Sequence, residues 1–149
     1  MTELPGIDLV ALERWLDDAA PGLRQGPLVG TLLTGGLSNL TYRLSDGTTT
    51  WALRRPPLGH ALPTAHDMAR EFRILSALHG TEVPVARPVV LCEDPDVVGA
   101  PFYLMSFVEG VVLDAPDTLA SLTPAQARHA CDRRVDTLLA LHRLDPAAV

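Results

Sequence analysis

Apolar positions along this chain recur at two spacings, one typical of helices and one typical of strands. The helical spacing of three and four residues recurs in three segments: residues 7–19, 64–79 and 123–144. Pro21 ends the first segment, Thr64 is the expected cap of the second, and Gly80 follows its end. Thr123 is the expected cap of the third, with Pro124 in its first turn. We therefore expect three helices.

Five shorter runs have the composition and alternation of strands: residues 28–34, 40–44, 48–54, 89–92 and 102–108. Asp46-Gly47, between the second and third runs, is a strong signal for a hairpin turn. Pro56-Pro57 ends the third run, because proline cannot donate a hydrogen bond to a neighbouring strand. The order is helix, three strands, helix, two strands, linker (residues 114–124), helix. This order predicts an α+β fold with a five-stranded, mostly antiparallel sheet.

Composition narrows the class of protein. The chain has 149 residues, the size of one ordinary domain, and its formal net charge of −6 weighs against binding to nucleic acid. No apolar run approaches the ~20 residues of a membrane-spanning helix. Residues 1–8 do not resemble a secretory signal, so we expect a cytoplasmic protein without a membrane partner. Cys92 and Cys131 suit neither a disulfide framework nor a metal knuckle, and we expect two buried free thiols.

Two features within the predicted strand region of residues 28–54 could carry chemistry. The loop Gly35-Gly36-Leu37-Ser38-Asn39 lies between predicted strands, where free N–H groups can meet phosphate oxygens; the alternative is a plain hairpin turn. All twelve basic residues are arginines, so a mechanism that needs a lysine has to use arginine. Arg54 ends the next strand of the same sheet, whereas Arg55 points to the opposite face. The alternative is that both arginines are simply exposed to solvent.

Three further features admit similar alternatives. Glu71 neighbours the apolar stripe of its helix and could point inward to pair with Arg54; a solvated glutamate paired with Arg70 or Arg73 fits equally well. Residues 105–110 could offer backbone N–H and C=O groups to a purine edge, or could form an ordinary edge strand. His66-Asp67 is a weak sign of a metal site, because such a site needs three or four ligands, and we expect none.

Together these features follow the order of a protein-kinase-like amino-terminal lobe. The sequence resembles the aminoglycoside phosphotransferase family of kinase-like enzymes. More narrowly, it resembles the branch related to the kinase-like region of certain acyl-CoA dehydrogenase fusion proteins. The resemblance covers nearly the whole chain. The segments that carry it are Gly-Gly-Leu-Ser-Asn-Leu-Thr-Tyr (35–42), Leu-Arg-Arg-Pro-Pro (53–57), Ala-His-Asp (65–67), Arg-Glu-Phe (70–72), Val-Pro (83–84), Cys-Glu-Asp (92–94) and Gly-Ala-Pro-Phe-Tyr-Leu-Met (99–105).

The resemblance implies a nucleotide-binding role for nine residues. Those that would cover the phosphates of ATP are Gly35, Gly36, Ser38 and Asn39. Arg54 would stand where kinases keep the sheet lysine, and Glu71 would be its helix partner. Met105 would guard the back of the adenine pocket, and Ser106 and Val108 would offer backbone atoms to adenine.

The resemblance also implies that two motifs of the family are missing from this sequence. The family's His-Gly-Asp-X-X-X-X-Asn catalytic loop and its further Mg²⁺-binding Asp have no counterpart here, so we expect no catalytic and no metal-binding residue. Residues 1–108 would be the kinase-like amino-terminal lobe, which binds the nucleotide. Residues 109–149 would be a linker and the first helix of a truncated carboxy-terminal lobe.

The expected function is the ATP-binding portion of a small-molecule phosphotransferase, inactive alone, with Mg²⁺ as its metal and a substrate hydroxyl as acceptor. The alternative is a non-catalytic interaction module or one subunit of a split enzyme. An exposed lobe interface also predicts self-association or a partner chain. Acyl-CoA dehydrogenase activity is disfavoured, because nothing resembles a flavin site. The sequence does not identify the acceptor, and it does not distinguish ATP from GTP as the phosphoryl donor.

Overall fold

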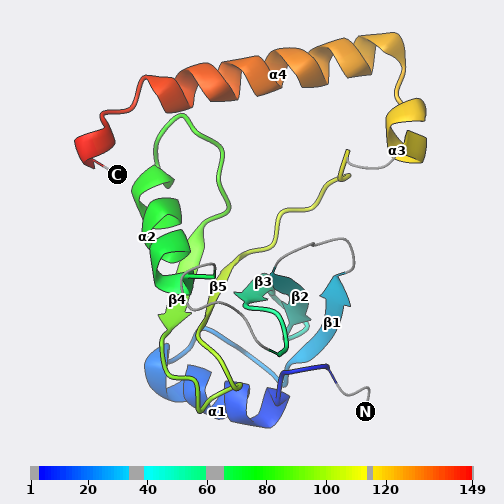
Figure 1. Ribbon diagram of the computed structural model, residues 1–149. Helices are drawn as coiled ribbons and strands as arrows, with labels where there is room; N and C mark the ends of the chain where they lie inside the picture. Colours follow the sequence, from blue (N-terminus) through cyan, green and yellow to red (C-terminus); the bar gives the residue numbers. More distant parts are fainter. Residues whose placement is uncertain (1–3, 34–38, 60–65, 114–115, 149) are drawn as a thin grey trace.

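One antiparallel sheet with helices on both faces forms the body of the protein (Figure 1). The computed structural model describes residues 4–33, 39–59, 66–113 and 116–148. Its elements are α1 Leu9–Ala19, β1 Val29–Leu33, β2 Leu40–Ser45, β3 Thr50–Arg55, α2 Met68–Leu78, β4 Pro88–Cys92, β5 Phe102–Ser106, α3 Pro116–Ala120, α4 Pro124–His142 and the 3-10 helix η1 Pro146–Ala148. The predicted α+β class and five-stranded sheet are confirmed.

The strands lie in the order β1-β2-β3-β5-β4, and every neighbouring pair is antiparallel. The predicted hairpin joins β2 to β3, and Gly47 in its turn has a φ of 89°, which a residue without a Cβ adopts at low cost. β5 inserts between β3 and β4. The segment after Ser106 therefore leaves the sheet beside β3, the strand that carries Arg54 and Arg55.

Side chains alternate between the two faces of the sheet. Trp51 and Leu53 of β3 share their face with the α1 side of the core, and Arg55 follows on that face. Ala52 and Arg54 point to the other face, which α2 covers. The alternation thus directs two consecutive arginines into two different environments.

The main core lies between α1 and the sheet. Leu12 and Leu16 of α1 are 0% and 1% exposed and pack in one cluster with the buried residues of the central strands. Trp15 contacts Phe102 of β5 edge to face, with ring centroids 5.1 Å apart. The apolar stripe expected over residues 7–19 therefore faces the sheet.

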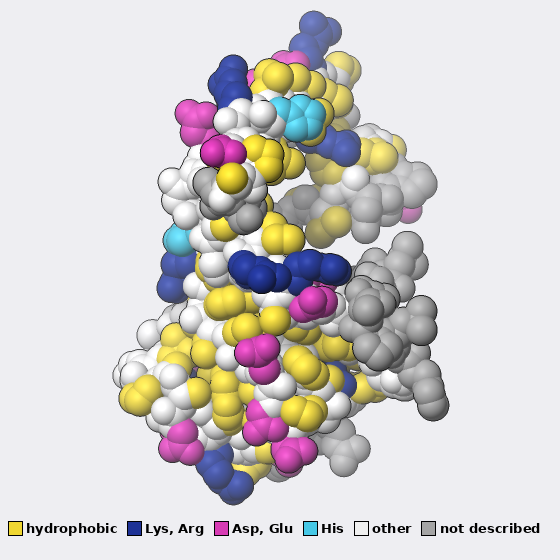
Figure 2. All heavy atoms as spheres, turned by 60° about the vertical axis from the view of Figure 1, so that its left-hand side comes forward, with side chains coloured by type: hydrophobic (Ala, Val, Ile, Leu, Met, Phe, Trp, Pro, Cys, Tyr) yellow, Lys and Arg dark blue, Asp and Glu magenta, His cyan; other side chains and the backbone are white. Residues whose placement is uncertain are grey.

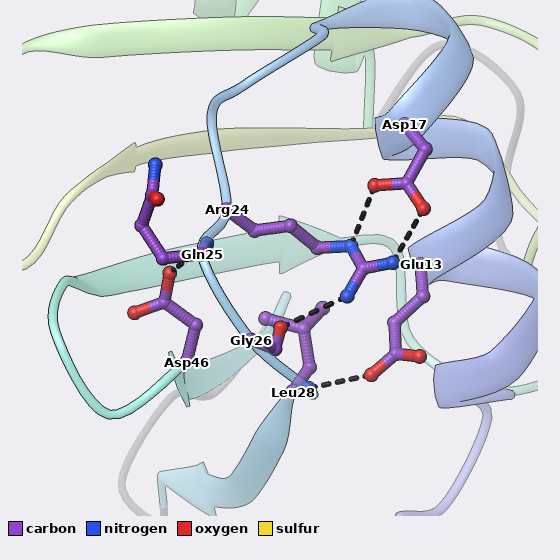
Figure 3. A network of polar contacts seen from close by, with 7 residues as sticks. All are labelled: Glu13, Asp17, Arg24, Gln25, Gly26, Leu28 and Asp46. Carbon is purple, nitrogen blue, oxygen red and sulfur yellow. Dashed lines mark hydrogen bonds and ion pairs between the residues drawn. The ribbon is translucent and has the colours of Figure 1, made fainter.

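Polar contacts fix the connection between α1 and β1 (Figure 3). Oε1 of Glu13 accepts a hydrogen bond from the N–H of Leu28 at 2.5 Å. Asp17 forms an ion pair with Arg24, whose Nε donates to Oδ1 at 2.8 Å. These two links hold the connection against α1 at the point where the chain enters the sheet.

α2 begins at Met68, four residues after the predicted start at Thr64. Asp67 is its cap, because its carboxylate accepts a hydrogen bond from the N–H of Arg70 at 2.8 Å. An aspartate at this position satisfies a free N–H of the first turn, so the helix needs no earlier cap. The prediction of Thr64 as the cap is wrong, and Thr64 itself lies outside the described residues. Gly80 follows the end of α2 with a φ of 91°, as expected of a terminating glycine.

α4 begins as predicted, with Thr123 as cap and Pro124 in the first turn. Thr123 and Gln126 form a capping box, in which each side chain bonds to the other residue's backbone. The segment expected to be a linker contains the short helix α3, so that part of the prediction is wrong. A run of five helical residues is too short for a recognisable apolar period.

α4 contacts the rest of the protein through a small second cluster (Figure 1). Ala140 packs there against Leu78 and Val83. Cys92 is buried as predicted, but Cys131 on α4 is exposed, because the core does not reach that part of the helix. Among the described residues, no helix combines the length and the hydrophobicity that crossing a membrane would need.

Candidate functional site

Arg54 and Glu71 form an ion pair between the end of β3 and the first turn of α2. Nε of Arg54 lies 2.9 Å from Oε2 of Glu71, and the two side chains are 31% and 30% exposed. The expectation that Glu71 turns toward Arg54 is confirmed, and the alternative pairing with Arg70 or Arg73 is excluded. The pair is anchored inside the fold and still open to solvent.

The carboxylate of Glu71 accepts three hydrogen bonds. Besides Arg54, Oε2 accepts from the hydroxyl of Tyr103 at 3.1 Å, and Oε1 accepts from Nδ2 of Asn39 at 3.0 Å. Burial raises the pKa of Tyr103, and the neighbouring charge of Glu71 raises it further, so the hydroxyl keeps its proton and remains a donor. Since both oxygens of Glu71 are held, the orientation of the carboxylate is fixed.

Asn39 lies inside the fold, with 5% of its surface exposed. Its Oδ1 is 2.6 Å from Nδ1 of His66, while its Nδ2 bonds to Glu71. Both ends of the side-chain amide are therefore used within the protein. Its contact with nucleotide phosphates stays a prediction, and the backbone of Asn39 is the group left to make it.

The outer nitrogens of Arg54 are the part of this cluster that can bind a ligand. Within the described residues their one hydrogen bond runs from Nη1 to Oγ1 of Thr41, at 3.5 Å, which is long for such a bond. A guanidinium presents five N–H donors in a planar fork that matches the oxygens of phosphate and carboxylate groups. Arg54 can therefore bind an anion with its outer edge while Glu71 holds its inner edge.

Met105, Ser106 and Val108 lie where the chain leaves the sheet. Met105 is opposite Ala52 of β3, on the same face as Arg54. The N–H of Ser106 donates to the carbonyl of Arg87 at 2.8 Å, and its hydroxyl accepts from the N–H of Arg87 at 2.9 Å. Val108 is 68% exposed and follows directly on the sheet. Their contacts with adenine stay predictions, and the N–H of Ser106 is already bonded.

Three of the predicted residues, Gly35, Gly36 and Ser38, lie outside the described residues. Among those that are described, no group of three or more His, Cys, Asp or Glu side chains could hold a metal ion. In the sequence, His66 was a weak sign of a metal site. In the structure, its ring contacts the side chain of Asn39.

Sequence reasoning did not assign Tyr103, Thr41 or His66 to this cluster. Tyr103 lies opposite Arg54 in the β3–β5 register, and Thr41 lies opposite it in the β2–β3 register. Alternation along β2 could have placed Thr41 on this face once the hairpin was predicted. No local signal gives the register between β3 and β5, because residues 56–101, which include α2 and β4, separate the two strands.

Arg55 belongs to a different environment. It is 4% exposed, and its guanidinium donates to the carbonyl oxygens of Gly6, Pro56 and Val98, the last at 2.7 Å. Burial lowers its pKa. The alternative in which both arginines are solvent-exposed is therefore wrong, and Arg55 ties the amino-terminal turn to the segment that precedes β5.

This sheet, with its arginine–glutamate pair between β3 and α2, has the architecture of kinase-like phosphotransferases. The crystal structure of a Ralstonia eutropha protein, provisionally assigned as an aminoglycoside phosphotransferase, matches with a TM-score of 0.74 and 36% sequence identity. The match covers 95% of this chain and 40% of that chain. The model of the phosphotransferase enzyme family matches residues 29–149. The chain belongs to this family.

Two relatives show that the narrower resemblance was also correct. Acyl-CoA dehydrogenase family member 11 of Homo sapiens is 35% identical over 141 residues, which cover 93% of this chain and 18% of that protein. Acyl-CoA dehydrogenase family member 10 of Mus musculus is 35% identical over 135 residues, which cover 91% of this chain and 12% of that protein. The chain therefore spans less than a fifth of each of these relatives.

Proposed function

We propose that this chain is the nucleotide-binding part of a phosphotransferase that moves a phosphoryl group from ATP to a hydroxyl of a small molecule. The observation that carries the proposal is the 2.9 Å ion pair between Arg54 and Glu71. In kinases a strand cation paired with a helix glutamate is held for contact with nucleotide phosphates. Membership of the phosphotransferase family supports the same chemistry for this pair.

The residues around Arg54 fit a polyphosphate. Its outer nitrogens carry N–H donors that no described carboxylate takes up, and 31% of the side chain is exposed. Glu71 would keep the guanidinium in place, and Gly35, Gly36, Ser38 and the backbone of Asn39 would cover the phosphates. Bound Mg·ATP would supply the transferable phosphoryl group and the metal charge. Met105, Ser106 and Val108 would bound the adenine.

Calorimetry with Mg·ATP tests this proposal, with AMP as the ligand control. We expect micromolar binding of Mg·ATP and much weaker binding of AMP, because AMP lacks the outer phosphates. Arg54→Met keeps the aliphatic stem but removes a charge-assisted contact, so Mg·ATP affinity should fall roughly 10- to 100-fold.

Arg14→Ala is the matched control, because Arg14 is an exposed arginine on α1, on the other side of the sheet. It changes the net charge by the same amount and should leave affinity unchanged. Equal losses in the two variants would point to general charge attraction, and unchanged affinity in Arg54→Met would refute the role of Arg54. A folded wild-type chain that does not bind Mg·ATP would refute the proposed function.

A second candidate is an interaction module that binds another chain. The observation in its favour is the exposed apolar surface of α4, where hydrophobic side chains gather at the top of Figure 2. Four large ones on this helix are 43–56% exposed: Val135, Leu138, Leu139 and Leu141. If the chain binds Mg·ATP but does not convert it to ADP, the result would agree with both candidates. Association without any nucleotide binding would favour the module alone.

A further inference from the structure

A continuous row of side-chain hydrogen bonds leads from Arg54 to His66, a residue just before the cap of α2. Arg54 donates to Oε2 of Glu71 at 2.9 Å, and Asn39 donates to Oε1 of Glu71 at 3.0 Å. Nδ1 of His66 lies 2.6 Å from Oδ1 of Asn39. The row thus links β3, α2, the entry to β2 and the segment before α2. Asn39, at its centre, is 5% exposed, so water does not readily replace its two bonds.

The chemistry of the groups fixes the direction of every hydrogen bond in this row. The carboxylate of Glu71, paired with a guanidinium, can only accept. Asn39 must therefore turn its NH₂ toward Glu71 and its oxygen toward His66. An amide oxygen also only accepts, so Nδ1 of His66 has to carry a hydrogen. In neutral His66 the Nδ1–H tautomer is selected, and the lone pair lies on Nε2.

We propose that His66 and Asn39 are positioning residues that keep the outer edge of Arg54 free for its ligand. The hydrogen bond from Asn39 occupies Oε1 of Glu71. Arg54 therefore pairs with Oε2, and it does so through Nε alone. Without Asn39, the carboxylate could offer both oxygens to Arg54 in a two-bond fork. That fork would occupy an outer nitrogen of Arg54. His66 acts one step further away by holding the oxygen of Asn39.

The inference rests on the proposed function, because the ligand of Arg54 is taken to be a nucleotide phosphate. Calorimetry with Mg·ATP on the 149-residue chain compares the wild type with His66→Ala and His66→Asn. Asparagine places an amide N–H close to the position of Nδ1. We expect about a tenfold loss of affinity in His66→Ala and recovery of most of it in His66→Asn. His79→Ala, an exposed histidine after α2, is the control and should bind as the wild type does.

A double-mutant cycle separates positioning from a general structural role. If His66 acts through Glu71 on Arg54, His66→Ala should cost nothing further in an Arg54→Met background. Thermal unfolding of every variant identifies any that fails to fold. Equal losses in both backgrounds, wild-type affinity in His66→Ala, or a failure of His66→Asn to restore binding would each overturn the proposal.

Nitrogen-15 NMR of the histidine rings tests the row of hydrogen bonds without any nucleotide. At about pH 8, where an ordinary imidazole is neutral, His66 should be the Nδ1–H tautomer. Asn39→Leu should shift it toward Nε2–H. An Nε2–H tautomer in the wild type would refute the row even if Mg·ATP binds. A wild-type chain with the expected tautomer but no affinity for Mg·ATP would refute the proposed function, and with it the positioning role, while the hydrogen-bond row itself would stand.

Discussion

Asp46 shows how one side chain at the residue scale can fix a turn. Its Oδ1 accepts from the N–H groups of Thr48 and Thr49, and its Oδ2 accepts from the N–H of Gln25 at 2.7 Å (Figure 3). The hydrogen bonds from Thr49 and Gln25 hold the pKa of Asp46 below its ordinary value. The charged carboxylate therefore stabilises both the β2–β3 hairpin and the entry to β1.

This depressed pKa gives a pH dependence of definite sign. Asp46 contributes stability above the ordinary carboxyl pKa of about 3.9 and loses it as the pH falls through its lower folded value. We expect Asp46→Asn to be less stable than the wild type at neutral pH, with the difference shrinking below about pH 4. Urea unfolding at several pH values measures this difference. Asp18→Asn, an exposed control on α1, should show no such narrowing, and a constant gap for Asp46→Asn would contradict the prediction.

At the scale of elements, the helices differ in what holds them. α1 buries Leu12 and Leu16 completely against the sheet, whereas α4 buries Ala140 alone of its described side chains. α2 lies between these extremes, with Met68 and Leu78 buried at its two ends and Glu71 half-buried near its start. Packing against the sheet therefore secures α1, whereas α4 has a capping box at its start and little packing along its length.

The contrast predicts the effect of removing one α1 side chain. Leu16→Ala should lower the free energy of unfolding by about 2–5 kcal/mol, because it leaves a cavity in the main core. Val10→Ala, on the same helix but 57% exposed, should change it by no more than about 0.5 kcal/mol. Urea unfolding monitored by circular dichroism measures both changes. Similar effects of the two substitutions would mean that α1 is not held by this core.

At the scale of the whole molecule, α4 lies away from the sheet and packs through a small cluster on the end of α2 and on the residues that follow it (Figure 1). Its exposed apolar residues are spaced as on one side of a helix, with Val135 56% and Leu138 51% exposed. Apolar surface of this kind is usually covered by another protein surface. In solution, a second copy of the chain is always present and can pack against this apolar surface of α4.

We therefore expect the 149-residue chain to self-associate as its concentration rises. Sedimentation velocity should show a growing weight-average coefficient for the wild type and a smaller increase for Leu138→Glu. Ala125→Glu adds the same charge at an exposed position in the first turn of α4 and should behave as the wild type does. A wild-type chain that stays monomeric at every concentration would remove self-association from the proposal.

Local patterns were enough to predict most elements and part of the site. The helical period located α1 and α4, Asp46-Gly47 located the hairpin, and strand alternation separated Arg54 from Arg55. These succeed because helical periodicity, turn chemistry and the strand period act between residues a few positions apart. The division at residues 108 and 109 and the contacts with a nucleotide remain predictions.

The sequence by itself determined the order of the candidate groups along the chain: a glycine-rich segment, an arginine at a strand end and a glutamate on the next helix. Only the tertiary structure decided how these groups are used. Asn39 faces Glu71 across 32 residues of sequence and His66 across 27, and Arg55 is buried against carbonyl oxygens 43 and 49 residues away. Such partners are chosen by strand register and by the packing of α2 on the sheet, and neither leaves a period in the local sequence.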